Sequence, residues 1–328
     1  MRNRVLVVGC GSIGQRHIRM LQGTGNGVEV AAVDPLEGKR EEVRNRYGLT
    51  DVYGTLDEVP PGSIDGVFIC SPPKFHVPQA LQALAHRVPI LIEKPLSNTL
   101  AGVEDLAAGA TAAGIPVGVS YNLRYLPQLE RARELLAAGR IGRVLCGRLV
   151  CAVNFAAGRP DYSRIYFASR DLGGGVILDH SHELDYLQWL LGDASAVMCM
   201  LDQRSDMQIE TEDVAMLLIR LADGALIDYH ANCFQRNRAR GLEIVGTDGT
   251  LLTDQVLNAL TLVQAGTREE IAFECDGDYS YREQDRNFCA VIRGQGSFRT
   301  PLDQGIQTLK LCLAAKQSAA SGRLVEIV

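Results

Sequence analysis

Three glycines near the start of the chain have the spacing of a loop that binds phosphate groups. The pattern Gly9-x-Gly11-x-x-Gly14 follows the apolar run 5–8 and leads into residues with helical spacing. In such a strand–turn–helix, the first glycine permits a tight turn, the second lets the backbone approach a pyrophosphate, and the third lets the helix lie close to the strand. Unpaired N–H groups at the helix start, at Ser12 and Ile13, favour an anion. The pattern predicts a dinucleotide-binding turn.

A carboxylate after the next apolar run indicates which dinucleotide binds. Asp34 follows the run 28–33 and lies twenty residues after Gly14. At that spacing a carboxylate accepts hydrogen bonds from the ribose hydroxyls of NAD and repels the 2′-phosphate of NADP. The alternative is that Asp34 only opens the turn at Pro35. We therefore expect NAD, while Lys39 and Arg40, which follow closely, leave NADP as an alternative.

A lysine at the end of a later strand is the candidate for proton transfer. The apolar run 89–92 delivers Glu93-Lys94-Pro95 at its carboxyl end, the edge at which open α/β sheets bind ligands. Beside a nicotinamide ring the Lys94 ammonium would be partly desolvated, so that its pKa falls towards neutrality and it exchanges a proton with a substrate hydroxyl. The alternative is a solvated lysine at a strand end, stiffened by Pro95.

Acidic and imidazole side chains after a triple glycine form a second candidate group. If a helix starts near residue 181, His182 and Asp185 share one of its faces, with Asp179 just before it. A carboxylate fixes the imidazole tautomer, and histidine exchanges protons near neutrality. The alternative is a packed helix histidine bonded to Asp185. A metal site would use His180, His182 and neighbouring carboxylates, but it lacks further ligands, so we expect no metal.

Arginines alternate with aromatic residues in the segment 159–170, just before the triple glycine. The planar guanidinium binds carboxylate and phosphate groups through a fork of N–H donors. Arg164 at the centre of the segment is therefore a candidate contact for an anionic sugar or a nucleotide sugar. A solvated loop or a contact between subunits explains the segment equally well.

The elements that must position these residues change in character along the chain. Apolar strands are expected at 4–8, 28–33, 65–70, 89–92 and 116–120, separated by helices near 13–23, 37–47, 76–86 and 99–113. This alternation predicts a doubly wound parallel sheet covered by helices, an α/β Rossmann domain over residues 1–121.

Beyond residue 121 strands follow one another with few helices between them. Strands are expected at 144–155, 195–202, 213–221, 225–233, 240–246, 250–253 and 258–264, and helices near 127–138, 181–191, 281–293 and 303–321. Asp223-Gly224 and Asp248-Gly249 are hairpin turns. We therefore predict an α+β domain over 122–328 with a large, mostly antiparallel open sheet, whose last helix could pack back on the first domain.

Five ordered motifs resemble the Gfo/Idh/MocA oxidoreductase family, which includes inositol 2-dehydrogenase and glucose–fructose oxidoreductase. They are the glycine turn, Ser71-Pro72-Pro73-x-x-His76, Glu93-Lys94-Pro95, Tyr121-Asn122-x-Arg124-Tyr125, and the triple glycine 173–175 followed by Asp179, His182 and Asp185. The resemblance implies hydride transfer between NAD(P) and a ring hydroxyl of a sugar, cyclitol or related compound. It also implies a homodimer or homotetramer formed through the second sheet.

The resemblance implies roles for particular residues. Lys94 serves proton transfer and binds the reacting oxygen, and Asp179 and His182 line the substrate pocket and assist. Ser71, Pro72, His76, Glu93 and Asn122 join the glycine turn in shaping the cofactor site, and Arg124 helps shape the substrate site. Many members place the histidine four residues after the aspartate, whereas here residue 183 is Glu and the histidine is His182. The order Asp179-His180-Ser181-His182-Glu183 resembles a subgroup associated with amino-sugar, sialic-acid-like or nucleotide-sugar metabolism.

Composition excludes several other classes of protein. The 328 residues carry a net charge of −6 with no long basic block, which argues against nucleic acid and anionic membranes as partners. No apolar run reaches the roughly 18 residues that span a bilayer. The nine cysteines include no Cys-x-x-Cys pair, so we expect thiols in a reducing cytoplasm. Cys10 is expected to be a small filler, although a helix N-terminus could lower its pKa.

Two rival functions remain open on sequence grounds. One is an NADPH-dependent reductase of a non-sugar imine or enone with the same architecture. The other is a non-catalytic NAD-binding regulator, against which Lys94, Asp179 and His182 argue, because a sensor needs no proton relay.

Overall fold

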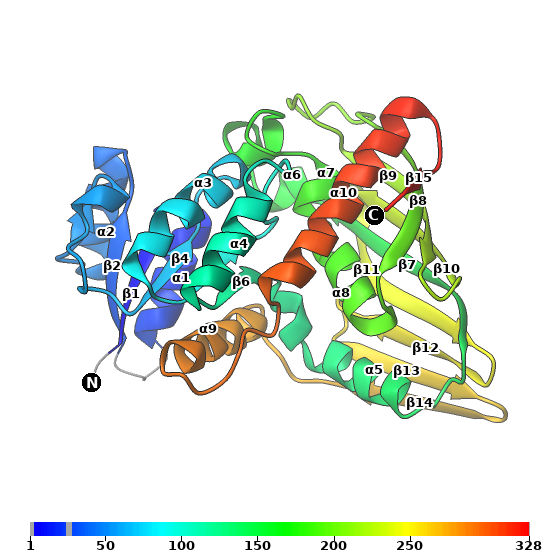
Figure 1. Ribbon diagram of the computed structural model, residues 1–328. Helices are drawn as coiled ribbons and strands as arrows, with labels where there is room; N and C mark the ends of the chain where they lie inside the picture. Colours follow the sequence, from blue (N-terminus) through cyan, green and yellow to red (C-terminus); the bar gives the residue numbers. More distant parts are fainter. Residues whose placement is uncertain (1–2, 24–27, 328) are drawn as a thin grey trace. The chain divides into compact units, whose positions relative to one another are not determined.

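The computed structural model describes residues 3–23 and 28–327, and this part of the chain divides into two compact units. The first unit comprises residues up to 122 together with 278–306, and the second comprises 123–277 together with 307–328. Figure 1 shows the helices and strands of both units. The second predicted domain, 122–328, is thus interrupted by a segment that belongs to the first unit.

The first unit is built on a six-stranded parallel sheet with the strand order β3-β2-β1-β4-β5-β6. Its strands are β1 (Arg4–Val8), β2 (Glu29–Val33), β3 (Val52–Tyr53), β4 (Gly66–Ile69), β5 (Ile90–Glu93) and β6 (Val117–Ser120). Helices α1 (Ser12–Gly23), α2 (Glu37–Tyr47), α3 (Pro73–Ala83) and α4 (Val103–Ala113) connect them. Strands β4 and β5 are buried throughout, as expected for a sheet covered on both faces. The predicted Rossmann architecture is confirmed.

Residues 278–306 complete the first unit from far along the chain. Helix α9 (Tyr279–Ile292) packs against α1, and its Phe288 belongs to the same hydrophobic cluster as Phe68 and Phe298. The Phe298 ring lies so close to Gly118 of β6 that a Cβ at residue 118 would be 2.5 Å from it. A Cβ at Gly66 of β4 would likewise lie 2.5 Å from the Ile292 side chain of α9, so close packing fixes α9, and the side chains that it carries, to the sheet.

The second unit contains a nine-stranded sheet with the order β14-β13-β12-β11-β7-β10-β9-β8-β15. All neighbouring strands are antiparallel except the parallel pair β7 and β10, so the predicted mostly antiparallel sheet is confirmed. Its strands are β7 (Val144–Asn154), β8 (Ala194–Asp202), β9 (Val214–Leu221), β10 (Leu226–Asn232), β11 (Phe234–Gly246), β12 (Gly249–Asp254), β13 (Ala259–Gln264), β14 (Thr267–Ala272) and β15 (Val325–Glu326).

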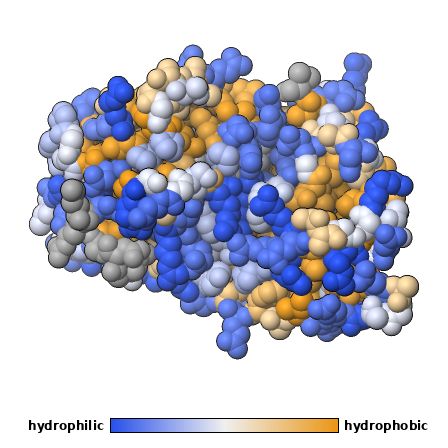
Figure 2. Space-filling view, turned by 60° about the horizontal axis from the view of Figure 1, so that its bottom comes forward, coloured by the Kyte–Doolittle hydropathy of each residue, from blue (hydrophilic) through white to orange (hydrophobic). Residues whose placement is uncertain are grey.

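Helices pack against this sheet, which places the catalytic candidates of the second unit on a helix–sheet layer. Helices α5 (Pro127–Ala137), α7 (Val176–Asp179) and α8 (Ser181–Leu191) contact its strands, and α6 (Phe155–Gly158) follows β7 (Figure 1). Helix α10 (Leu302–Ser321) begins in residues of the first unit and continues in the second. Hydrophilic residues cover much of the face drawn in Figure 2, with hydrophobic patches between them. Among the described residues, no helix is long and apolar enough to cross a bilayer.

Candidate functional site

The glycine turn is closed by contacts that only glycine permits. Gly9 has a φ of +98°, and its N–H donates to the Val33 carbonyl oxygen at 2.8 Å. A Cβ on Gly14 would lie 1.9 Å from the Gly9 carbonyl oxygen, so this residue can only be glycine if α1 keeps its place. Gly11 has open space around it, with nothing within 4 Å of a Cβ built there. The turn therefore has a tight interior and an open outer side, which fits a bound pyrophosphate.

Asp34 both closes the turn and presents a carboxylate next to it. Its Oδ2 accepts the Cys10 N–H at 2.8 Å and its Oδ1 accepts the Leu36 N–H at 2.9 Å, which leaves each oxygen able to accept a further bond. Arg40 donates to the carbonyl oxygens of Asp34 and Pro35, and Lys39 pairs with Glu42 at 2.8 Å. The two basic residues are thus held by groups in α2 and in the turn just before it, and the residues fit NAD.

Cys10 differs from one expectation. Its thiol is fully buried, with Sγ 3.8 Å from the Val33 carbonyl oxygen. Burial first, and then the nearby Asp34 charge, raise the pKa of Cys10 to about 12. The filler role is what the packing shows, and the expected lowering of the pKa by the helix N-terminus is wrong because desolvation dominates.

The strand-end segment of β5 is held from both sides. Glu93 Oε2 accepts the Lys94 N–H at 3.0 Å, and His76 Nδ1 lies 2.8 Å from the Pro95 carbonyl oxygen. The other ring nitrogen of His76 is 2.6 Å from the Ser71 carbonyl oxygen, so this buried ring joins the loops after β4 and β5. Lys94 is half-buried, and a Cβ on Gly9 would be 2.7 Å from the Ser71 N. The loop after β4 thus lies against the glycine turn, and His76 ties it to the segment carrying Lys94.

Asn122, expected near the cofactor, lies at the end of the first unit's core segment. It is 2% exposed, and its amide donates to Ser280 Oγ at 2.8 Å. Its side chain therefore fixes the start of α9. Pro72 occupies the position just before α3, without a side-chain capping bond.

In the second unit, Asp179 and His182 lie at the junction of α7 and α8. Asp179 is half-buried and accepts a short hydrogen bond from the Tyr166 hydroxyl. His180 Nε2 lies 3.9 Å from Asp179 Oδ2, and His182 in the first turn of α8 is 8% exposed. Tyr166, Asp179 and His180 thus form a cluster of phenol, carboxylate and imidazole, able to hold polar hydroxyls and exchange protons, and His182 follows two residues after His180. Sequence reasoning missed Tyr166 as a member of it.

The triple glycine positions that cluster by close backbone packing. A Cβ on Gly174 would lie 2.2 Å from the Phe167 carbonyl oxygen, and Gly175 has a φ of +100°. The segment carrying Tyr166 can therefore lie directly against the start of α7. Arg164 on the same segment is exposed and lines a hollow of about 550 Å³ with Met207 and Glu210.

Asp185 and Arg124 bind each other in the interior of the second unit. Arg124 is 1% exposed, and its Nε and Nη2 donate to the two Asp185 carboxylate oxygens at 2.8 Å and 2.6 Å. Asp185 is thus committed to a buried ion pair rather than to orienting His182. The Arg124 guanidinium also lies 5.6 Å from the Trp189 ring centre. The Arg124 side chain therefore lies in the interior of the second unit, and its expected part in shaping the substrate site stays a prediction.

Within residues 3–23 and 28–327, no group of three or more histidine, cysteine, aspartate or glutamate side chains is arranged to hold a metal ion.

Comparison with known proteins gives consistent matches over both units. The family described as "Oxidoreductase family, NAD-binding Rossmann fold" matches residues 3–121, and the "GFO/IDH/MocA C-terminal domain" matches residues 129–252. The 1,5-anhydro-D-fructose reductase of Ensifer adhaerens is 28% identical over 80% of this chain and 80% of its own. An inositol 2-dehydrogenase of Burkholderia cenocepacia is 30% identical over 76% of this chain and 73% of its own.

Solved structures agree. The structure of GenD2 from gentamicin A biosynthesis, in complex with NAD, is 26% identical and covers 100% of this chain and 97% of its own, with a TM-score of 0.86.

Proposed function

The chain belongs to the Gfo/Idh/MocA family of NAD-binding oxidoreductases, and on that premise we propose that it oxidises or reduces a hydroxyl-bearing carbon of a sugar, amino sugar, nucleotide sugar or cyclitol. The observation that carries the proposal is the first unit's sheet edge. There the open glycine turn, the Asp34 carboxylate and the strand-end Lys94 follow β1, β2 and β5 of the same parallel sheet. NAD, when bound, accepts a hydride from the substrate carbon or, as NADH, returns it.

The cofactor-binding residues are proposed from the geometry of the turn. The N–H groups of Gly11, Ser12 and Ile13 bind the pyrophosphate, because the turn is open on that side. Asp34 accepts hydrogen bonds from the adenosine ribose and disfavours a 2′-phosphate. Ser71, Pro72, Glu93 and Asn122 shape the same sheet edge through their backbone and packing.

Lys94 is proposed to move the proton of the reacting hydroxyl. Its side chain is half-buried and its peptide is fixed by Glu93, so an amine is held at a strand end with restricted freedom. A positioned amine whose pKa lies near the working pH is an effective general acid or base. In the second unit, Asp179 and His182 are proposed to bind substrate hydroxyls and assist, with Tyr166 holding the Asp179 carboxylate in place.

Substrate choice is proposed from chemistry and from the relatives. The two curated relatives carry the names of an anhydro-sugar reductase and a cyclitol dehydrogenase, both acting on polyhydroxylated rings. We also propose that the exposed Arg164 guanidinium binds an anionic substituent of the substrate.

The test is a panel of neutral, amino, uronic-acid and nucleotide sugars and cyclitols, assayed with NAD and with NADP by nicotinamide absorbance. Turnover with a polyol and NAD supports the proposal. Reduction of imines or enones by NADPH alone favours the non-sugar reductase, and NAD binding without turnover on any compound favours a regulator.

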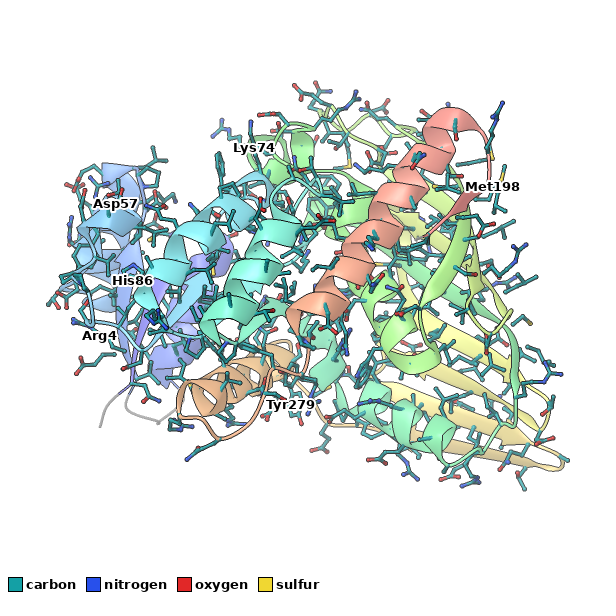
Figure 3. The ribbon with its side chains drawn as sticks, in the orientation of Figure 1. Arg4, Asp57, Lys74, His86, Met198 and Tyr279 are labelled. Atoms are coloured by element: carbon teal, nitrogen blue, oxygen red, sulfur yellow. The ribbon has the colours of Figure 1, made fainter. Side chains whose placement is uncertain are left out.

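The outer face of the second sheet is proposed to bind a second copy of this chain. Met198, Leu218 and Leu226 are exposed on neighbouring strands and line a hollow of about 660 Å³ (Met198 is labelled in Figure 3). Met216, on the same strand as Leu218, is exposed as well. Exposed apolar side chains gathered in this way mark an interaction surface, and a self-complementary sheet face pairs by two-fold symmetry. Sedimentation velocity on the wild type and on Leu218→Glu tests this. We expect a dimer or tetramer that dissociates in the variant, and a monomeric wild type would contradict it.

A further inference from the structure

Three buried, charged side chains of the first unit form a hydrogen-bonded network to which the proposed reaction assigns no role. His17 Nε2 lies 3.0 Å from Glu93 Oε1, and His17 Nδ1 lies 3.1 Å from Asp285 Oδ1. His17 and Asp285 are fully buried, and Glu93 is 6% exposed. Asp285 lies in α9, whose first residue, Tyr279, is labelled in Figure 3. An imidazole donates to a carboxylate from each nitrogen only when both nitrogens carry protons.

The charges of the three groups support that state. Burial lowers the pKa of His17, but the contacts with Asp285 and Glu93 outweigh it and raise the pKa to about 9. Burial raises the pKa of Glu93, yet the hydrogen bond and charge of His17 bring it below its ordinary value. Burial raises the pKa of Asp285. The rings of Phe68 and Tyr281 also face His17, with 4.0 Å and 5.7 Å between ring centres. Burial first, and then the charges of Glu93 and Asp285, raise the pKa of the Cys70 thiol.

Glu93 connects this network to Lys94. One carboxylate oxygen, Oε1, accepts from His17 and also from Ser120 Oγ, the latter at 2.7 Å. The other, Oε2, accepts the Lys94 N–H at 3.0 Å. Besides His17, the charge of Lys94 also contributes to lowering the pKa of Glu93, so the two side chains interact electrostatically. Without a compensating cation, the Glu93 carboxylate would favour the charged form of the Lys94 side chain, since an opposite charge raises the pKa of an amine.

Packing of α1 on α9 does not by itself require His17. Arg16, the preceding residue of α1, donates through Nε to Asp278 at 3.0 Å, and its guanidinium lies 3.9 Å from the Tyr281 ring centre. The two helices are thus already joined by an ion pair and a cation–π contact that do not reach Glu93. His17 differs from Arg16 in contacting the carboxylate that binds the Lys94 peptide.

We propose that His17 is a positioning residue for Lys94: its positive charge offsets that of Glu93, so that Glu93 fixes the Lys94 peptide without holding the Lys94 amine in its charged form. The proposal deepens the proposed function, because it rests on Lys94 as the group that moves the proton. It assigns a role to His17, which lies three residues after Gly14, and to its partner Asp285 in α9.

The test measures the protonation of Lys94 directly, without turnover. The full-length protein is acetylated competitively with acetic anhydride across a range of pH, and the Lys94 peptide is quantified by mass spectrometry. The variants are His17→Gln, which keeps one donor and removes the charge, and the control Asp278→Asn, which breaks the ion pairs of Arg16 and Arg19 in α1 with the residue that precedes α9. We expect the Lys94 pKa in His17→Gln to rise by about half a pH unit or more. In Asp278→Asn we expect no shift.

An unchanged Lys94 pKa in folded His17→Gln would overturn the proposal, as would an equal shift in Asp278→Asn. Should His17→Gln fail to fold, ¹⁵N-histidine NMR of the wild type decides. We expect His17 to keep both ring protons well above its ordinary pKa of 6.5, and titration at that ordinary value contradicts the proposal. Because neither measurement needs substrate, a protein inactive on every sugar would refute the proposed function while leaving this test intact.

Discussion

Replacing Gly14 by alanine should damage both folding and cofactor binding, and the size of the effect follows from one distance. The new Cβ would lie 1.9 Å from the Gly9 carbonyl oxygen, whereas real Cβ atoms are found no closer than 3.0 Å to such neighbours. Gly9 cannot move away, because its N–H is bonded to Val33 and its own Cα faces the backbone of residues 70 and 71. A rigid backbone clash of this kind costs about 3 kcal/mol or more.

Gly11→Ala is the matched control within the same turn. Nothing lies within 4 Å of its built Cβ, so its free energy of unfolding should stay within about 1 kcal/mol of the wild type. Its methyl group would still crowd the side on which we place the pyrophosphate. Urea denaturation and calorimetric titration with NAD should show Gly14→Ala losing stability and binding, and Gly11→Ala losing binding alone. A Gly14→Ala protein with wild-type stability would refute the packing argument.

Three further predictions follow from buried charges. Arg124→Met leaves the Asp185 carboxylate buried and unpaired, so urea denaturation should show the free energy of unfolding falling by about 3–5 kcal/mol. The double variant Arg124→Met/Asp185→Leu should recover much of that loss, because it removes both charges. A loss below about 1 kcal/mol in Arg124→Met would contradict the pairing. Because the folded pKa of His17 is raised from 6.5 to about 9, its contribution is complete below pH 6.5 and is lost as the pH rises through about 9. That contribution to the free energy of unfolding amounts to about 3 kcal/mol. Between pH 6.5 and about 9, the stability of the wild type should therefore fall relative to that of His17→Gln. Parallel plots of stability against pH for the two proteins would disprove this. Asp34→Asn should weaken NAD binding about tenfold and should reduce the preference of the protein for NAD over NADP, measured as the ratio of the two Kd values. An unchanged ratio would show that Asp34 does not bind the ribose.

Local pattern predicted most of the fold because the strands of the first unit are buried on both faces and read as apolar runs. The short strands β3 and β15, of two residues each, and the polar edge strand β14 (Thr267–Ala272) escaped prediction, since neither length nor alternation marks them. The place of α9 in the first unit also escaped, because an amphipathic pattern shows that a helix has a buried face but not which core covers it.

The candidate site divides in the same way. Residues in one continuous motif, such as the glycine turn, could be predicted because their geometry depends on neighbours in sequence. Partners distant in sequence could not: His17 and Asp285 are 268 residues apart, and Arg124 and Asp185 are 61 apart. The pairing of Asp185 with Arg124 could not be predicted for this reason, since helical spacing makes a contact with His182 available but does not reveal the buried guanidinium that binds the same carboxylate. Tyr166 could have been suspected only from the aromatic residues that alternate with arginines before the triple glycine.

The measurement that tests the account most directly is the turnover number of Lys94→Met, with NAD affinity determined on the same sample. If this amine moves the hydroxyl proton, turnover should fall by about two to four orders of magnitude, while the Kd for NAD changes little because the glycine turn and Asp34 are intact. Turnover within a few-fold of the wild type would contradict the central claim.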